Sequence, residues 1–152
     1  TKEDVPAAFW TAFGWGSYIN ISRTDPEALA YLPKAEALMD FVRRTDSTYY
    51  FGGAHLFLGT IEGSMPAVLG GRPEKAKQFF ETSLSIGGGK FLMTYFYYAK
   101  TYAVQVQDQQ LFESLLAKVI DAPADILPSA KFPNAVAKQK ARRLLAKANE
   151  LF

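Results

Sequence analysis

Few residues of this chain have the chemistry and the spacing of a catalytic or metal-binding site. His55 is the only histidine and cysteine is absent, so a zinc site with two histidines or a thiolate nucleophile has no ligands here. The Gly87-Gly88-Gly89-Lys90 run resembles a phosphate loop, but Phe91 stands where Ser or Thr would hold magnesium and no strand precedes it. We therefore predict no catalytic site, no metal and no cofactor. The glycines are interpreted as a helix stop, and His55 as a hydrogen-bonded core residue.

Charge and composition narrow the classes of partner. The net charge of +2 is too small for the strong basic field that nucleic acids select, so we expect no nucleic-acid partner. The longest apolar run, Phe91–Ala99, is far shorter than the roughly 20 residues of a membrane-spanning helix. Lys138, Arg142 and Lys147 fall opposite the apolar stripe of the last helix and predict a solvated face. The 14% aromatic share is high for a small domain, and surplus aromatics predict self-association.

Apolar residues recur at helical spacing along the chain, and no alternating strand pattern appears. Caps, prolines and glycines divide the pattern into seven helices. Their expected ranges are Val5 to Ile21, capped by Asp4; Pro26 to Arg44, with a kink or restart near Pro33; Tyr50 to Ile61, ended by the break at Gly63–Pro66; Pro73 to Leu84; Phe91 to Val106; Leu111 to Val119, capped by Asp108; and Ala137 to Phe152, capped by Asn134.

The third to sixth helices follow the spacing of a tetratricopeptide repeat, in which a Leu-Gly step marks the first helix of each pair. Leu58-Gly59 occupies this step, Trp15-Gly16 repeats it, and Ala99 takes the place of the glycine in the fifth helix. A small residue lets two helices cross closely, so we expect crossings at Gly16, Gly59 and Ala99. The predicted fold is all-α: one domain spanning residues 1–152, an antiparallel helix-turn-helix array with a C-terminal capping helix. A non-repetitive helical bundle is the alternative.

The resemblance to tetratricopeptide proteins also implies a concave groove, because fixed positions of the first helices face it in those proteins. Asn20 and Lys100 then become polar groups among apolar ones, which suits an organic acid or a partner segment, although packing between repeats is the alternative explanation. The implied groove residues are Trp10, Phe13, Ser17 and Asn20 in the first helix, and Met93, Phe96, Lys100 and Ala103 in the fifth.

Several longer segments resemble the T-component family of tripartite ATP-independent periplasmic (TRAP) transporters. The most specific are Gly53-Ala54-His55-Leu56-Phe57-Leu58-Gly59 and Leu69-Gly70-Gly71-Arg72-Pro73-Glu74-Lys75-Ala76. The others are Trp15-Gly16-Ser17, Asp25-Pro26-Glu27-Ala28-Leu29 and the C-terminal Glu150-Leu151-Phe152.

The resemblance implies a non-catalytic accessory protein of the periplasm that associates with the substrate-binding P component and forms a trimer. Its ligand is expected to be an apolar organic acid. Family chains are longer and often carry a lipid anchor on an N-terminal cysteine, so we expect this sequence to be the C-terminal part of a longer chain whose anchor lies elsewhere. The alternative function is a generic tetratricopeptide-like scaffold that grips a peptide or helix.

Overall fold

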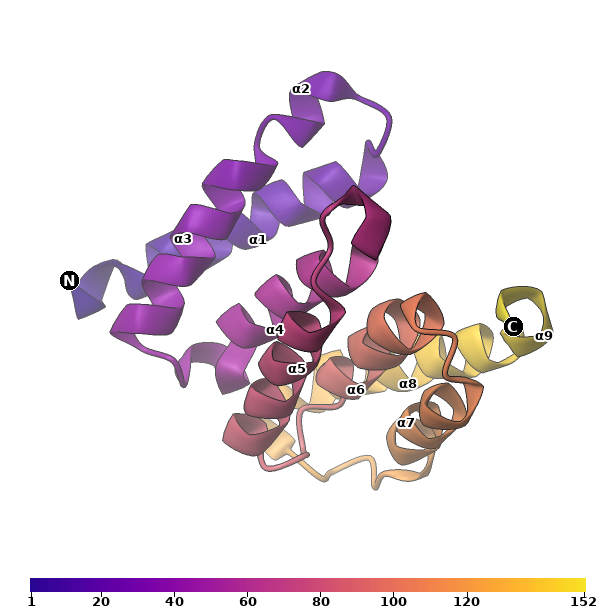
Figure 1. Cartoon of the computed structure of the whole chain (residues 1–152). Helices are drawn as coiled ribbons and strands as arrows, with labels where there is room; N and C mark the ends of the chain where they lie inside the picture. Colours follow the sequence, from indigo (N-terminus) through magenta and orange to yellow (C-terminus); the bar gives the residue numbers. More distant parts are fainter.

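Every regular element of the protein is a helix, as the computed structural model of residues 1–152 shows (Figure 1). The prediction of an all-α fold is therefore confirmed. The helices are α1 (Val5–Ile21), α2 (Pro26–Leu29), α3 (Leu32–Thr45), α4 (Tyr49–Ser64), α5 (Pro73–Gly87), α6 (Leu92–Tyr98), α7 (Gln109–Asp121), α8 (Lys131–Leu145) and α9 (Ala148–Leu151). Short 3-10 turns are η1 (Lys2–Asp4), η2 (Ala67–Leu69) and η4 (Pro128–Ala130), and η3 (Ala99–Ala103) is a π-helical continuation of α6.

Neighbouring helices pack as antiparallel pairs. α1 packs on α3, α4 on α5, and α6 on α7, while α8 contacts both α6 and α7 and covers the end of the array. α3 also contacts α4, and α5 contacts α6, so each pair is joined to the next. The first helices of the three pairs, α1, α4 and α6, run in the same direction, so their C-terminal ends lie along one edge of the molecule (Figure 1).

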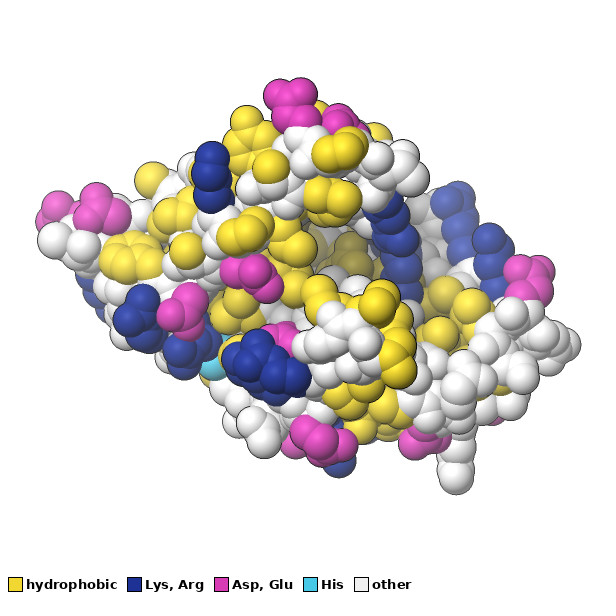
Figure 2. All heavy atoms as spheres, turned by 45° about the horizontal axis from the view of Figure 1, so that its top comes forward, with side chains coloured by type: hydrophobic (Ala, Val, Ile, Leu, Met, Phe, Trp, Pro, Cys, Tyr) yellow, Lys and Arg dark blue, Asp and Glu magenta, His cyan; other side chains and the backbone are white.

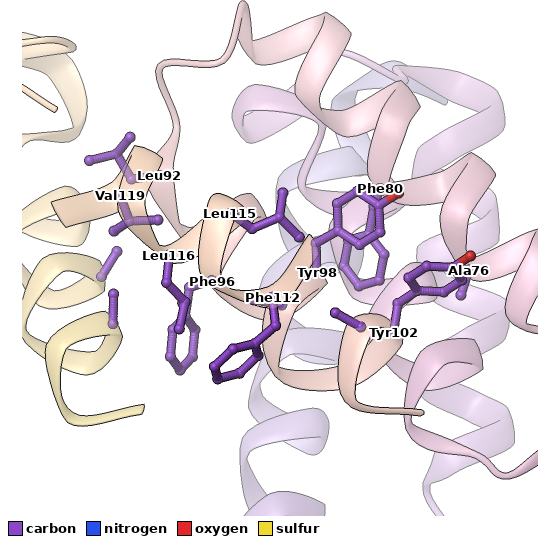
Figure 3. Close-up of a cluster of buried hydrophobic side chains, with 14 residues drawn as sticks. Ala76, Phe80, Leu92, Phe96, Tyr98, Tyr102, Phe112, Leu115, Leu116 and Val119 are labelled. Carbon is purple, nitrogen blue, oxygen red and sulfur yellow. The ribbon is translucent and has the colours of Figure 1, made fainter. Parts of the chain in front are cut away.

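Two apolar clusters form the core. The N-terminal cluster holds nine buried residues from α1, α3 and α4. The C-terminal cluster holds 14 buried residues from α5 to α8 (Figure 3). In the second cluster Phe80 of α5 stacks on Tyr98 of α6, with ring centroids 4.9 Å apart. Each fully buried large side chain contributes about 1.5–3 kcal/mol, which makes this contact between successive pairs energetically important.

Small residues stand where helices cross, as predicted. A Cβ on Gly16 would lie 2.6 Å from the Phe57 ring, and a Cβ on Gly59 would lie 3.1 Å from Cβ of Phe79. Ala99 is completely buried. The crossings of α1 with α4 and of α4 with α5 therefore depend on the absence of a side chain at one point each.

Two further glycines bring other helices close to α4. A Cβ on Gly53 would lie 2.7 Å from the Phe9 ring of α1. A Cβ on Gly63 would lie 2.8 Å from Oγ1 of Thr101 in η3. Together with Gly59, these residues let α4 contact a helix of each of the three pairs at close range.

The start of α4 is not a regular helix, in contrast to the prediction that begins it at Tyr50. Tyr50, Phe51 and Gly52 have left-handed backbone angles, with φ of 47°, 59° and 76°. Left-handed angles cost free energy for residues other than glycine. Phe51 stacks on Phe91 at 5.0 Å and Tyr50 contacts the same ring at 5.7 Å, so aromatic packing holds this turn. Right-handed helix begins at Gly53.

Asn134 does not cap the last long helix, and that prediction is wrong. α8 begins earlier, at Lys131, and Asn134 is a buried residue within it. Its Oδ1 accepts the backbone N–H of Leu92 at 2.9 Å, and its Nδ2 donates to the carbonyl of Lys90 at 2.9 Å. Asn134 therefore caps the start of α6 from a different helix and ties α8 to the array.

The sequence also predicted features at the ends of three other helices. Pro33 stands in the first turn of α3, so the predicted restart is confirmed. Gly88 adopts a left-handed conformation and ends α5, as expected of the glycine run. Asp4 is the N-cap residue of α1, as predicted, but its carboxylate accepts from the N-terminus and hydroxyl of Thr1 and makes no capping hydrogen bond to α1.

Lys138 is not part of a solvated face, contrary to the prediction. Its ammonium group donates to the carbonyls of Ile120 and Ala122 at the C-terminal end of α7. Cations stabilise helix C-termini, so this lysine links α8 to α7. Arg142 and Lys147 are exposed, as predicted.

The Gly59 crossing generates a stability prediction. Gly59→Leu should lower the free energy of unfolding by about 1–3 kcal/mol or more, because the added side chain meets α5 at a closed contact. Gly14→Leu is the matched control, since a Cβ at Gly14 meets no atom within 4 Å. Urea denaturation followed by circular dichroism measures both. Equal stability of the two variants would show that the crossing is not tight.

A second prediction concerns the cap supplied by Asn134. Asn134→Ala should cost about 2 kcal/mol of unfolding free energy, because it leaves the buried N–H of Leu92 without an acceptor. Asn149→Ala, at an exposed position of α9, should change stability by less than about 0.5 kcal/mol. A comparable loss in both variants, measured by the same denaturation, would refute the capping role.

Candidate functional site

A cavity of about 240 Å³ opens at the edge where the first helices end. Figure 2 views this edge and shows a hollow surface with Lys and Arg side chains beside it. α1 and the residues after it, α4, and the α6–η3 helix with its last turn contribute the walls, so all three helix pairs take part. The lining residues are Asn20, Arg23, Thr60, Gly63, Ser64, Tyr97, Lys100, Thr101, Val104 and Gln105.

The charge of this cavity is positive and unbalanced. Arg23 and Lys100 line it, and no acidic residue does. Arg23 donates to Oδ1 of Asn20 at 2.6 Å and to its carbonyl at 3.3 Å, both uncharged acceptors. Neither Arg23 nor Lys100 forms a salt bridge. Two cations without a counter-ion at a concave surface create a positive potential that attracts anions.

Burial weakens the charged state of Lys100. Its pKa is lowered mainly by desolvation and further by the positive charges of Arg23 and Lys140. Its ammonium lies over the rings of Phe96 and Tyr97, 6.0 and 5.8 Å from their centroids. These cation–π contacts offset part of the desolvation cost. An incoming anion would raise the pKa of Lys100 and relieve the repulsion among the three cations.

The π-helical segment η3 positions the cavity wall. Lys100 and Thr101 both belong to η3 and both line the cavity. Thr101 donates its hydroxyl to the carbonyl of Tyr97 at 2.7 Å, and Gly63 leaves room for it on α4. π-helical turns are rare and occur frequently at functional sites, because the wider turn redirects the side chains.

The structure separates the groove residues predicted from the tetratricopeptide resemblance into two groups. Asn20 and Lys100 meet at the cavity. Trp10 and Phe13 lie earlier on α1 and are 44% and 49% exposed. Ser17 stands exposed between them and Asn20, with its hydroxyl bonded to the carbonyl of Phe13 at 2.9 Å.

Trp10 and Phe13 form an exposed aromatic cluster with the start of α4. The indole N–H of Trp10 donates to the Tyr49 hydroxyl at 3.2 Å, and its ring lies 5.0 Å from that of Tyr50. Phe96 is 5% exposed, so it supports Lys100 from below rather than lining an open surface. Met93 is half-buried and Ala103 is fully buried.

Arg23, Tyr97 and Thr60 were missed from the sequence. Arg23 follows the end of α1, where helical periodicity no longer assigns it to a face. Tyr97 is interpreted from sequence only as one of many surplus aromatics, yet burial raises the pKa of its hydroxyl while the charge of Arg23 partly opposes that. The only sequence signal for Arg23 was its place just after the helix that carries Asn20.

His55 differs from its sequence interpretation. It is 7% exposed, but neither ring nitrogen has a hydrogen-bond partner in the protein, so the hydrogen-bonded core histidine is a wrong prediction. Its ring lies 6.0 Å from that of Phe79. Burial, with a smaller effect of Arg43, lowers the pKa of His55 and favours the neutral imidazole. His55 therefore packs as an apolar ring and lies outside the cavity.

A second, shallower depression of about 300 Å³ lies between α3, α4 and α5. The Glu62 carboxylate forms ion pairs there with Arg72 and Lys75, so the charges of these three side chains largely compensate one another.

No group of three or more His, Cys, Asp or Glu side chains in the chain is arranged to hold a metal ion. No helix is both long and apolar enough to cross a membrane.

The comparisons with known proteins identify one family. The family model described as "TRAP transporter T-component" matches residues 1–152, which is the whole chain. No curated protein sequence matches significantly.

The unbalanced charge at the cavity predicts a stability effect. Lys100→Met should raise the free energy of unfolding at pH 7 by up to about 0.5 kcal/mol, because the folded state disfavours the charged form of the lysine. The gain is small because part of the side chain stays in water. Lys147→Met, at an exposed position, is the control and should have no effect. Thermal and urea denaturation test this. A clear loss of stability in Lys100→Met would instead mean that Lys100 is a structural residue.

Proposed function

Since this chain belongs to the TRAP transporter T-component family, we propose that it is a non-catalytic accessory protein that binds the P component of its transporter and an organic acid. The cavity that holds Arg23 and Lys100 without any lining carboxylate carries this proposal. Charge-assisted hydrogen bonds to a carboxylate contribute about 1.5–3 kcal/mol each, so two cations are enough to orient an acid.

The geometry supports an acid with an apolar part. Tyr97 and Val104 provide apolar area within the cavity. Trp10 and Phe13 are exposed on the face of α1 that also carries Asn20, since positions 10, 13, 17 and 20 follow helical spacing. Phe13 lies roughly 10 Å along the axis from Asn20, at 1.5 Å per residue. When the carboxylate of the acid lies near Arg23 and Lys100, the alkyl or aromatic tail of the same acid can extend along α1.

Three other features belong to the same proposal. The protein works in the periplasm, where a P component is found, and is held near the membrane by an N-terminal lipid anchor outside residues 1–152. It forms a homo-oligomer, a trimer by family resemblance, and the exposed aromatic rings of Trp10 and Phe13 provide apolar area for such contacts. A generic tetratricopeptide-like scaffold remains the competing function.

Binding of a carboxylate tests the role of the cavity. Lys100→Ala and Arg23→Gln should each weaken octanoate by roughly 1–3 kcal/mol, about 5- to 150-fold, with little change in the melting temperature. Calorimetric titration measures this, with octanol as the uncharged ligand and Lys147→Ala as the matched variant. Octanol should bind the wild type and the cavity variants equally.

The outcomes separate the two functions. Octanoate binding that is unchanged in Lys100→Ala and Arg23→Gln would remove the acid from the proposal. Absence of any complex between the complete wild-type protein and the P component of its transporter at tens of micromolar would favour the generic scaffold.

A further inference from the structure

Each helix that lines the cavity ends with an exposed apolar residue directly after a lining residue. The same arrangement occurs in three different helix pairs, so it is a property of the helical array and not of one local sequence. The pairs are Asn20 and Ile21 at the end of α1, Ser64 and Met65 at the end of α4, and Gln105 and Val106 just after η3; the apolar members are 84%, 37% and 39% exposed. Apolar side chains therefore stand beside the lining of a cationic cavity on three sides.

The loop that follows α4 adds two highly exposed apolar side chains to this edge. Val68 is 91% exposed and Leu69 is 72% exposed, and both lie on η2. The backbone N–H of Gly71 donates to the carbonyl of Pro66 at 3.0 Å and closes the loop. A Cβ on Gly71 would lie 1.8 Å from the carbonyl oxygen of Met65, so only glycine permits this closure. The loop thus presents two apolar side chains on a closed, hydrogen-bonded turn.

These residues form one surface, which we name the apolar collar: Ile21, Met65, Val68, Leu69 and Val106. With Leu29 of α2, this edge carries six of the ten large apolar side chains that are exposed in the whole chain. Figure 2 shows apolar side chains around the hollow. Such concentration of exposed apolar area on one side of a protein marks an interaction surface.

Charge distinguishes the partners that fit the collar. Arg23 and Lys100 lie at its centre without a counter-ion. A second copy of the chain, placed face to face, would oppose these cations with the same cations. An anionic lipid surface would approach the carboxylates of Asp25, the N-cap of α2, and of Glu27 in its first turn. A partner with an apolar contact face and an anion at its centre matches both the collar and the cations.

We infer that the apolar collar is the docking surface for the P component of the same transporter, seated so that its bound acid faces the cavity. This inference rests on the proposed function, which supplies the acid-carrying partner. Contact through the collar would cover the cavity mouth and remove water from around Arg23 and Lys100. Desolvation strengthens the attraction of these cations for the acid, so docking and acid binding reinforce each other.

The double variant Val68→Asp/Leu69→Asp tests the collar. Both side chains are largely exposed, so the fold should not change, and two carboxylates would replace the apolar contact with charged groups that must be desolvated when a partner docks. The matched control is Phe132→Asp, because Phe132 is 80% exposed at the N-terminal end of α8, near the start of α6 and away from the collar. Surface plasmon resonance with the purified, acid-loaded P component should show at least a tenfold weaker complex for the double variant and less than a twofold change for Phe132→Asp.

Further measurements on the same variants separate the explanations. If the double variant binds octanoate with an affinity within threefold of wild type, the cavity is intact. Loss of the complex with the P component then supports the collar as the docking surface. Undiminished binding of the P component by the double variant would overturn the collar and leave the proposed function standing. If wild type itself forms no complex, the proposed function fails as well. A change in sedimentation mass of the double variant without a change in P-component affinity would assign the collar to contacts between copies.

Discussion

Close approach to α4 is the constraint on which the rest of the structure depends. Gly53, Gly59 and Gly63 leave α4 without side chains at the points where α1, α5 and η3 contact it. Each missing Cβ would lie between 2.7 and 3.1 Å from an atom of the neighbouring helix, closer than van der Waals contact permits. The two apolar clusters lie on either side of this helix, so the array remains continuous only because α4 is narrow at these three points.

The same approach also shapes the cavity. Gly63 faces Thr101 in the π-helical segment, and both residues line the cavity wall together with Lys100. The unpaired cation of Lys100 beside this wall costs stability, because burial and repulsion by Arg23 and Lys140 disfavour its charged form. Packing elsewhere offsets that cost: α5 and α6 are joined by the stack of Phe80 on Tyr98, and α6 is held at its start by Asn134. The proposed site thus lies at one end of the first helices, while the other end is anchored.

The two ends of α6 illustrate this division. Its N-terminal end is enclosed by Phe91, by the left-handed turn at Phe51 and by the side chain of Asn134. Its C-terminal end widens into η3 and carries Lys100 into the cavity. A helix fixed at one end and widened at the other can hold a charged side chain at a defined place without burying it completely. The exposed residues that follow, such as Val106, then form part of the outer surface.

Local chemistry determines most of the helices and explains why they were predictable. Helical spacing of apolar residues, the restart at Pro33, the stop at Gly88 and the crossings at Gly16 and Gly59 depend on short stretches of chain, and the structure bears them out. Asn20 and Lys100 were predicted from the resemblance to tetratricopeptide proteins, in which these positions of the first helices face one concave groove, and both line the cavity.

Contacts between residues distant in the chain lie beyond such patterns. Asn134 bonds to Leu92, 42 positions away, and so caps another helix instead of its own. The π-helical turn at Lys100, the left-handed turn at Tyr50 and the unpartnered imidazole of His55 arise from packing against neighbouring helices. Arg23 lines the cavity but follows the end of α1. Helical periodicity therefore does not predict the direction of its side chain. Local energies select the helices, and only the balance of packing among them decides which polar groups meet.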